Sequence, residues 1–324
     1  MKAIVARSYG PPEILRCEEV EEPVPGPGEV LIAVKAAGLN MLDRHMTRGT
    51  PFFGRLFLGL RRPKNGRVGR DVAGIVEEAG TGVTRFKPGD AVFGACRGAL
   101  AERACAGEAN LAIKPANVSF EQAGAVAVAG LTALQGLRDA GRIAAGQKIL
   151  INGASGGIGT FAVQIAKAFG AEVTGVCSAA NLDLVRSIGA DRVIDYGKED
   201  FTSGGPGYDM IFDIIGNRSY RSCRRALAPR GILVAAGAGG PDARGMGRVL
   251  ARAIMHRLVS KFTRRKLVMF LTRITTDDLA ALAALMAEGS LVPVVGSAYP
   301  LAEAGRGMRD VASGHARGKV VVTT

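Results

Sequence analysis

Three side chains that could do chemistry lie within six positions near the N-terminus. The stretch AAGLNMLDRHM, residues 36–46, contains Asn40, Asp43 and His45. This grouping suits a metal site, a proton relay or the solvated end of a strand, because imidazole and carboxylate groups serve in all three. His45 alone cannot hold a metal, since a zinc site needs three or four ligands.

A second stretch, KILINGASGGIGTFAVQIAKAFGAEVTGVCS at 148–178, predicts a dinucleotide site. A buried strand leads into a glycine-rich turn, and a helix is expected over 157–168. Glycines let backbone amides approach a pyrophosphate, and the helix N-terminus adds aligned N–H donors. The expected cofactor-binding residues at this turn are Ser155, Gly156, Gly157 and Ile158.

The end of the next strand decides which nucleotide is expected. An NAD site has Asp or Glu there to bind the ribose 2′-hydroxyl, but this chain has Ser178, followed closely by Asn181. Without a carboxylate to repel a 2′-phosphate, NADPH is favoured. Arg317 is the expected source of positive charge, and Tyr196, which closes the third strand, is an expected hydroxyl donor.

Length and composition predict an ordinary two-domain globular protein. The 324 residues are 48% hydrophobic and 22% charged, which excludes a disordered chain. The five cysteines form no CxxC pair, which argues against a disulfide framework and a thiolate zinc cage. The sequence shows no signal peptide and no apolar run long enough to span a membrane, so a cytoplasmic location is expected.

The net charge of +13 is concentrated in one stretch. Residues 244–266 contain eight Lys and Arg, of which Arg244, Arg248 and Arg252 recur every four positions on one helical face. A solvated helix face is the simplest interpretation. An acidic substrate or an anionic membrane surface are the alternatives, and nucleic acid is less favoured because no binding motif accompanies the charge.

The chain reads as two architectures in succession, an α/β fold overall. Short β-branched runs separated by turns fill the first 115 residues. From Ser119, which opens a capping box with Gln122, apolar strands alternate with helices, and this predicts a doubly wound parallel sheet. The expected domains are 1–118, to which 290–324 returns, and 119–289.

The whole chain resembles the medium-chain dehydrogenase/reductase superfamily, in its zinc-free quinone oxidoreductase-like branch. The subgroup with the mitochondrial reticulon-interacting NADPH oxidoreductase is especially similar. The motifs that carry the resemblance are EPVPGPGEVLIAVKAAGLN, GRDVAGIVEEAGTGVTRFKPGDAVFG, AGLTALQGL, GASGGIGTFAVQIAKAFGAEV, IGADRVIDY and GHARGKVVV.

The resemblance implies a GroES-like catalytic domain joined to a Rossmann domain. It implies that Thr132 lies near the nicotinamide, that Gly216 and Gly237 line the cofactor cleft, and that His315 and Arg317 approach the adenosine end. It also implies a homodimer formed through edge strands of the Rossmann sheet, which we expect in YDMIFDIIG and GILVAAG.

The resemblance further implies that no metal is bound. Zinc-dependent relatives have Cys where Asn40 stands and Gly-His-Glu where this chain has Gly69, Arg70 and Asp71. Asn40 becomes the expected hydrogen-bond donor to a developing oxyanion. His45 is either a proton donor or a structural histidine. Asp43 is expected to cap or pair, and Arg70 and Asp71 are expected to pair with each other.

Without a Lewis acid, the hydride acceptor must be electrophilic by itself, as quinones and α,β-unsaturated carbonyls are. The leading hypothesis is therefore an NADPH-dependent reductase of such acceptors. One alternative is an enoyl or acyl-thioester reductase, with residues 244–266 meeting CoA or carrier phosphates. The other is a non-catalytic NADPH-binding protein that uses the basic surface on a membrane or nucleic acid.

Overall fold

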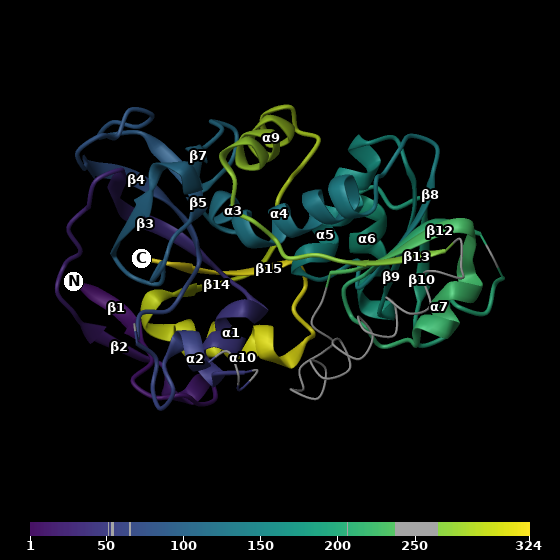
Figure 1. Ribbon diagram of the computed structural model, residues 1–324, viewed down its shortest axis with the longest axis horizontal. Helices are drawn as coiled ribbons and strands as arrows, with labels where there is room; N and C mark the ends of the chain where they lie inside the picture. Colours follow the sequence, from purple (N-terminus) through teal and green to yellow (C-terminus); the bar gives the residue numbers. More distant parts are fainter. Residues whose placement is uncertain (51, 53–54, 65, 206, 237–264) are drawn as a thin grey trace. The chain divides into compact units, whose positions relative to one another are not determined.

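The computed structural model describes residues 1–50, 52, 55–64, 66–205, 207–236 and 265–324, without the side chains of Phe57 and Leu58. Two compact units form (Figure 1). The first joins Met1–Leu131 to Arg273–Thr324, and the second is Thr132–Thr272. Gly237 and residues 244–264 lie outside the described residues.

The first unit is built on a seven-stranded sheet. Its order is β14-β15-β3-β4-β5-β7, with β6 paired to β3, and all pairs are antiparallel except β14 with β15. The C-terminal strand β15, yellow in Figure 1, therefore lies between β14 and β3. The bounds are β3 Glu29–Leu39, β4 Asp71–Ala79, β5 Ala91–Ala95, β6 Arg103–Gly107, β7 Leu111–Ile113, β14 Val295–Pro300 and β15 Lys319–Thr323.

A separate pair of strands and several helices complete the first unit. Strands β1 (Lys2–Val5) and β2 (Arg16–Glu19) form an antiparallel pair. The helices are α1 Met41–Arg48, α2 Arg55–Leu58, α3 Phe120–Gly124, α9 Thr276–Ala287 and α10 Ala304–Ser313. Helix α4, Ala127–Gln135, contains the division between the units. The predicted domain of short strands is confirmed.

The two units divide at other residues than the sequence suggested, because helices α3 and α9 pack on the first unit. Helix α3 lies so close to β3 that a Cβ on Gly124 would be 2.9 Å from the Ala36 carbonyl oxygen. Helix α9 is held by Asn117, whose Nδ2 donates to the Met286 carbonyl at 2.9 Å. Residues 119–131 and 273–289 therefore belong with the first unit rather than the second.

The second unit contains the predicted parallel sheet. Six strands lie in the order β10-β9-β8-β11-β12-β13, and every pair is parallel. This is the doubly wound order, in which the chain reverses direction across the sheet between β8 and β11, and ligands bind beyond the carboxyl ends of such strands. The bounds are β8 Lys148–Asn152, β9 Glu172–Cys177, β10 Arg192–Asp195, β11 Tyr208–Asp213, β12 Leu227–Ala235 and β13 Lys266–Met269.

Helices connect these strands, as the alternation predicted. They are α5 Gly157–Ala168, α6 Leu182–Ser187 and α7 Tyr220–Ala226. The helix expected over 157–168 is confirmed. The central strands have apolar middles, with Leu150, Ile211 and Val234 fully buried, because helices contact both β8–β9 and β12. Short helical turns occur at Pro12–Ile14, Glu108–Asn110, Gly136–Ala140, Ala179–Asn181 and Leu301–Glu303.

One expectation for the second sheet is wrong, and one of its strands was not expected. YDMIFDIIG and GILVAAG form β11 and β12, each paired on both sides, so neither is an edge strand that a partner could extend. In the described part of the chain the edges are β10 and β13, and β13 was not expected at all. No described helix is long and apolar enough to cross a membrane.

Candidate functional site

A buried polar cluster lies where β3 gives way to α1 in the first unit. Asn40 is the residue between the two elements, with extended backbone angles of φ −128° and ψ 154°. Its side-chain Nδ2 donates to Asp71 Oδ2 at 3.0 Å and to the Gly38 carbonyl at 3.4 Å. Asn40 thus has its amide hydrogens directed at acceptors within its own cluster.

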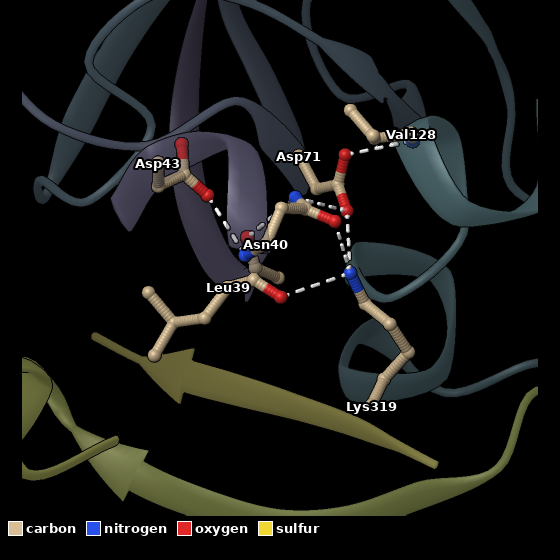
Figure 2. A network of polar contacts seen from close by, with 7 residues as sticks. Leu39, Asn40, Asp43, Asp71, Val128 and Lys319 are labelled. Carbon is tan, nitrogen blue, oxygen red and sulfur yellow. Dashed lines mark hydrogen bonds and ion pairs between the residues drawn. The ribbon is translucent and has the colours of Figure 1, made fainter. Parts of the chain in front are cut away.

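Lys319 supplies the positive charge of this cluster. Its Nζ donates to Asn40 Oδ1 at 2.6 Å, to the Leu39 carbonyl at 3.0 Å and to Asp71 Oδ2 at 3.1 Å (Figure 2). An ammonium has three hydrogens, and each has an acceptor here. The side chains of Lys319 and Asp71 are 3% and 0% exposed, so the pair is a fully desolvated salt bridge.

Asp71 is held from two sides. While Oδ2 faces Lys319 and Asn40, Oδ1 accepts the Val128 backbone N–H at 2.8 Å, as Figure 2 shows. Gly38 makes room for this arrangement, because a Cβ there would lie 2.8 Å from Asp71 Oδ2 and 2.5 Å from the Gly124 carbonyl oxygen. The expected pairing of Arg70 with Asp71 is wrong, since the carboxylate turns inward to Lys319 instead.

Asp43 caps α1, as the sequence predicted. Its Oδ2 accepts the Asn40 backbone N–H at 2.8 Å. Burial, reinforced by the negative charge of Asp71, raises the pKa of Asp43 from 3.8 to about 7, against the opposing effects of the Asn40 N–H, Lys319 and Arg70. Asp43 therefore changes charge near neutral pH, inside a cluster that already contains one carboxylate and one ammonium.

His45 lies two residues after Asp43 in α1. Its Nδ1 is 3.2 Å from Thr50 Oγ1, and its carbonyl oxygen accepts the Gly49 and Thr50 N–H groups at the end of the helix. Burial, with the nearby charges of Arg44 and Arg48, lowers the pKa of His45. These contacts give His45 a structural place, while its expected part in proton donation stays a prediction.

The donor set around Asn40 does not fit zinc. It consists of an amide, a main-chain carbonyl and one carboxylate, and the cation among them is the Lys319 ammonium. Within the described ranges, no group of three or more His, Cys, Asp or Glu is arranged to hold a metal ion. Sequence reasoning missed Lys319, because the strand order β15-β3-β4, and no local pattern, brings it beside Asn40 and Asp71.

The glycine-rich turn of the second unit has the geometry expected of a dinucleotide site. Gly153 has a φ of +93°, which favours glycine, and α5 begins directly after Gly156. Gly159 lets the helix pack on the turn, since a Cβ there would lie 2.0 Å from the Gly153 carbonyl oxygen. At Gly156 the corresponding distance is an ordinary 3.5 Å, so this position is open. Ile158 lies in the first turn of α5.

Three expected cofactor residues meet beside this turn. Asn181 Nδ2 donates to Ser178 Oγ at 3.1 Å and to Ser155 Oγ at 3.2 Å. Asn181 Oδ1 is buried and has no hydrogen-bond partner among the described residues. A buried orphan acceptor is costly unless a ligand donates a hydrogen bond to it, so the site suits a hydrogen-bond donor such as a ribose hydroxyl.

The remaining expected residues of the second unit lie at strand ends or in the helices. Tyr196 follows β10, whose Asp195 is in register with Cys177 of β9, so Tyr196 lies beside Ser178 and is exposed. Gly216 follows β11 with a φ of +70°, and its N–H donates to Asp213 Oδ1 at 2.8 Å. Thr132, in α4, has its Oγ1 2.8 Å from that of Thr272.

His315 and Arg317 belong to the first unit and follow α10. Both are exposed, and the His315 N–H donates to Ser313 Oγ at 3.2 Å. Ser178 and Tyr196 belong to the second unit. The expected approach of His315 and Arg317 to the adenosine end of the cofactor therefore stays a prediction.

Both halves of the chain match known protein families. Residues 26–167 match the alcohol dehydrogenase GroES-like domain, which agrees with the strand-rich first unit. Residues 188–322 match a family described as zinc-binding dehydrogenase. The donor set around Asn40 departs from the zinc chemistry that this description mentions, as shown above.

Similar proteins are found along the full length. The chain is 34% identical to the chloroplastic quinone oxidoreductase QR1 of Triphysaria versicolor, over 99% of this chain and 98% of that protein. It is 31% identical to the mitochondrial NAD(P)H oxidoreductase RTN4IP1 of Bos taurus, over 99% and 89%. The Escherichia coli quinone oxidoreductase complexed with NADPH superposes with a TM-score of 0.83 at 26% identity, with 100% of both chains covered.

Proposed function

The chain belongs to the medium-chain dehydrogenase/reductase superfamily, in its quinone oxidoreductase branch, and on this premise we propose that it is an NADPH-dependent reductase of quinones or activated enones. The proposal includes the absence of a catalytic zinc ion. One observation carries it: the cation at the centre of the Asn40 cluster is the Lys319 ammonium, whose three hydrogens are all in use.

The choice of NADPH rests on the cluster at the end of β9. Ser155, Ser178 and Asn181 offer hydroxyl and amide groups where an NAD site has a carboxylate. A 2′-phosphate meets no negative charge from these three residues. Related proteins are named NAD(P)H oxidoreductase or bind NADPH, which supports the same choice.

Each part of the glycine-rich turn has a role toward this cofactor. The open position at Gly156 and the N-terminus of α5 hold the pyrophosphate through backbone N–H groups. Asn181 Oδ1, the buried acceptor, binds a hydroxyl of the adenosine ribose. NADPH supplies a hydride when bound. The chain itself contributes binding, alignment and the exclusion of water.

The acceptor class follows from the Asn40 cluster. An ammonium with filled hydrogen bonds does not polarise a carbonyl as an open metal site does, so the acceptor must already be electrophilic. Asn40 remains the expected oxyanion donor, because its contact with the Gly38 carbonyl at 3.4 Å is the longest in the cluster and is the easiest to exchange. His45 is the second expected donor.

A steady-state assay tests the proposal. NADPH and NADH are compared as reductants for a panel of small quinones, enones and CoA thioesters, with and without a chelator. We expect NADPH oxidation with at least one quinone or enone, unaffected by the chelator. Tight NADPH binding without turnover of any acceptor would instead indicate a binding protein. Turnover of thioesters alone would favour the enoyl or acyl-thioester reductase.

A further inference from the structure

The segment after α1 exposes three large apolar side chains. Phe52, Leu56 and Leu60 are 73%, 65% and 62% exposed, and they recur every four residues. Exposed apolar residues are common singly, but three of this size within nine residues form a local apolar surface. Nothing in the Asn40 cluster or the nucleotide site uses these side chains.

The body of the first unit holds this segment in place. The Arg55 guanidinium stacks over the Tyr9 ring at 4.4 Å and over the Phe52 ring at 5.0 Å, and its Nε donates to the Gly49 carbonyl at 3.1 Å. Tyr9 Oη donates to the Gly59 carbonyl at 2.6 Å. These polar contacts therefore anchor Arg55 and Gly59, while the side chains of Phe52, Leu56 and Leu60 are exposed.

Positive charge surrounds the apolar side chains. Between residues 44 and 70 the sequence has seven Arg, one Lys and no Asp or Glu. Arg61, Arg62 and Lys64, next to Leu60, are exposed. Gly59, at a φ of +118°, packs its backbone against that of Arg62, which holds the cations close to the apolar residues.

We propose that Phe52, Leu56, Leu60, Arg61, Arg62 and Lys64, the 52–64 surface, bind an anionic lipid bilayer. Large apolar side chains enter the boundary between headgroups and acyl chains, and flanking cations meet anionic headgroups. A second copy of the chain is disfavoured because the same cations would repel each other. A nucleic acid would use the cations but leave Phe52, Leu56 and Leu60 without apolar contacts.

Vesicle co-sedimentation of the full chain tests the charge requirement. We expect binding to vesicles that contain phosphatidylglycerol, weakening with salt, and little binding to pure phosphatidylcholine. Arg61→Glu with Arg62→Glu should weaken binding roughly tenfold or more, given the contribution of each cation near an anionic surface. Lys87→Glu with Lys198→Glu, at exposed sites elsewhere, removes the same net charge and should cause a much smaller loss.

A second double variant and its control test whether vesicle binding requires the apolar side chains. Leu56→Ser with Leu60→Ser should weaken vesicle binding, whereas Val24→Ser with Leu271→Ser, at positions 83% and 89% exposed, should leave it unchanged. All four positions are exposed, so the fold tolerates these changes. Circular dichroism of each variant checks that it does.

The chain contains no tryptophan, which allows a single reporter of insertion. Phe52→Trp should show a blue-shifted emission with anionic vesicles and quenching by lipids brominated on the acyl chain. Val24→Trp should show neither. Equal binding by the Arg61/Arg62 and Lys87/Lys198 variants, or an unquenched Trp at position 52 in vesicle-bound protein, would overturn the proposal. None of these measurements depends on enzymatic turnover, so they stand apart from the proposed function.

Discussion

The Lys319 ammonium lies 3.1 Å from the Asp71 carboxylate, although 248 residues separate them in the chain. Both side chains are withdrawn from solvent. Lys319 is in β15 and Asp71 begins β4, and β3 lies between these strands in the sheet. The pair thus ties the returning C-terminal strand to the cluster around Asn40.

Removing Lys319 alone should strongly destabilise the protein. Lys319→Met leaves Asp71 charged and buried, and breaking a buried pair in this way costs about 3–5 kcal/mol. The free energy of unfolding is measured by urea titration. Lys148→Met is the control, because Lys148 and Glu172 form an exposed pair at 3.9 Å that contributes about 1 kcal/mol or less.

The double variant Lys319→Met with Asp71→Asn should recover part of this loss, since it removes both buried charges together. A double variant as unstable as the sum of the two single variants would show that the pair is not coupled. The comparison therefore separates loss of the ion pair from loss of packing.

Asp43 should make stability fall as pH rises toward neutrality. Its pKa of about 7 exceeds its usual 3.8, so between these values the folded protein holds a proton that the unfolded chain has released. The contribution of this proton to the free energy of unfolding is complete below about pH 4 and is lost as pH rises through 7. In Asp43→Asn the residue does not titrate, and its Oδ1 can still accept the Asn40 N–H.

Urea unfolding of both proteins at about pH 5 and about pH 8 measures this effect. The stability of the wild type relative to Asp43→Asn should fall by on the order of 2 kcal/mol across that interval. Taking the difference between the two proteins cancels the groups that titrate in both. A difference that stays constant with pH would contradict the raised pKa.

Local patterns predicted only part of the Asn40 cluster. The capping role of Asp43 depends on a neighbour three residues away, and the sequence displays it. The partner of Asp71 does not follow from such a pattern, because strand order places β15 beside β3. Arg70 was the nearest cation in sequence, but successive residues along a strand point to opposite faces of the sheet. Lys319 could be identified as the partner of Asp71 only once the strand order of the sheet was known.

Ser178 should determine the preference for NADPH. If the proposed function holds, Ser178→Asp places a carboxylate beside the 2′-phosphate and raises the KM for NADPH by roughly tenfold or more. The same carboxylate can bind the 2′-hydroxyl of NADH, whose KM should fall. Ser203→Asp, at an exposed position in the same unit, is the control and should leave both values unchanged.

Two alanine substitutions in the glycine-rich turn should differ in their effects on stability and on NADPH binding. Gly159→Ala forces a Cβ to 2.0 Å from the Gly153 carbonyl and should lower stability by about 1–3 kcal/mol. Gly156→Ala has φ −83° and only an ordinary contact at 3.5 Å, so its stability should be retained. Its methyl group instead occupies the space where the pyrophosphate approaches.

Isothermal titration with NADPH and urea unfolding, applied to both glycine variants, measure the contrast. Gly156→Ala should bind NADPH more weakly at unchanged stability. Unimpaired NADPH binding by Gly156→Ala would remove this turn from the proposed cofactor site.

The second unit was easier to predict than the first. Its strands β8, β9 and β11 have apolar middles, its helices alternate with strands, and α5 lies at the expected residues. The short strand β13 was missed because it follows a basic stretch and contains only the apolar residues Leu267, Val268 and Met269 after Lys266. The residues at which the units divide also differ from the predicted domain bounds. The sequence of α9 predicts a helix, but it does not indicate which unit this helix packs on.

The central place of β15 affects how the protein is made. The second unit, 132–272, is one continuous stretch of the chain, so all of it has been synthesised before residue 273 is added. The first unit, although its synthesis starts earlier, lacks an inner strand of its sheet until residues 319–323 appear. The half that is begun first is thus finished last, and until then the nascent chain carries Asp71 without its ammonium partner.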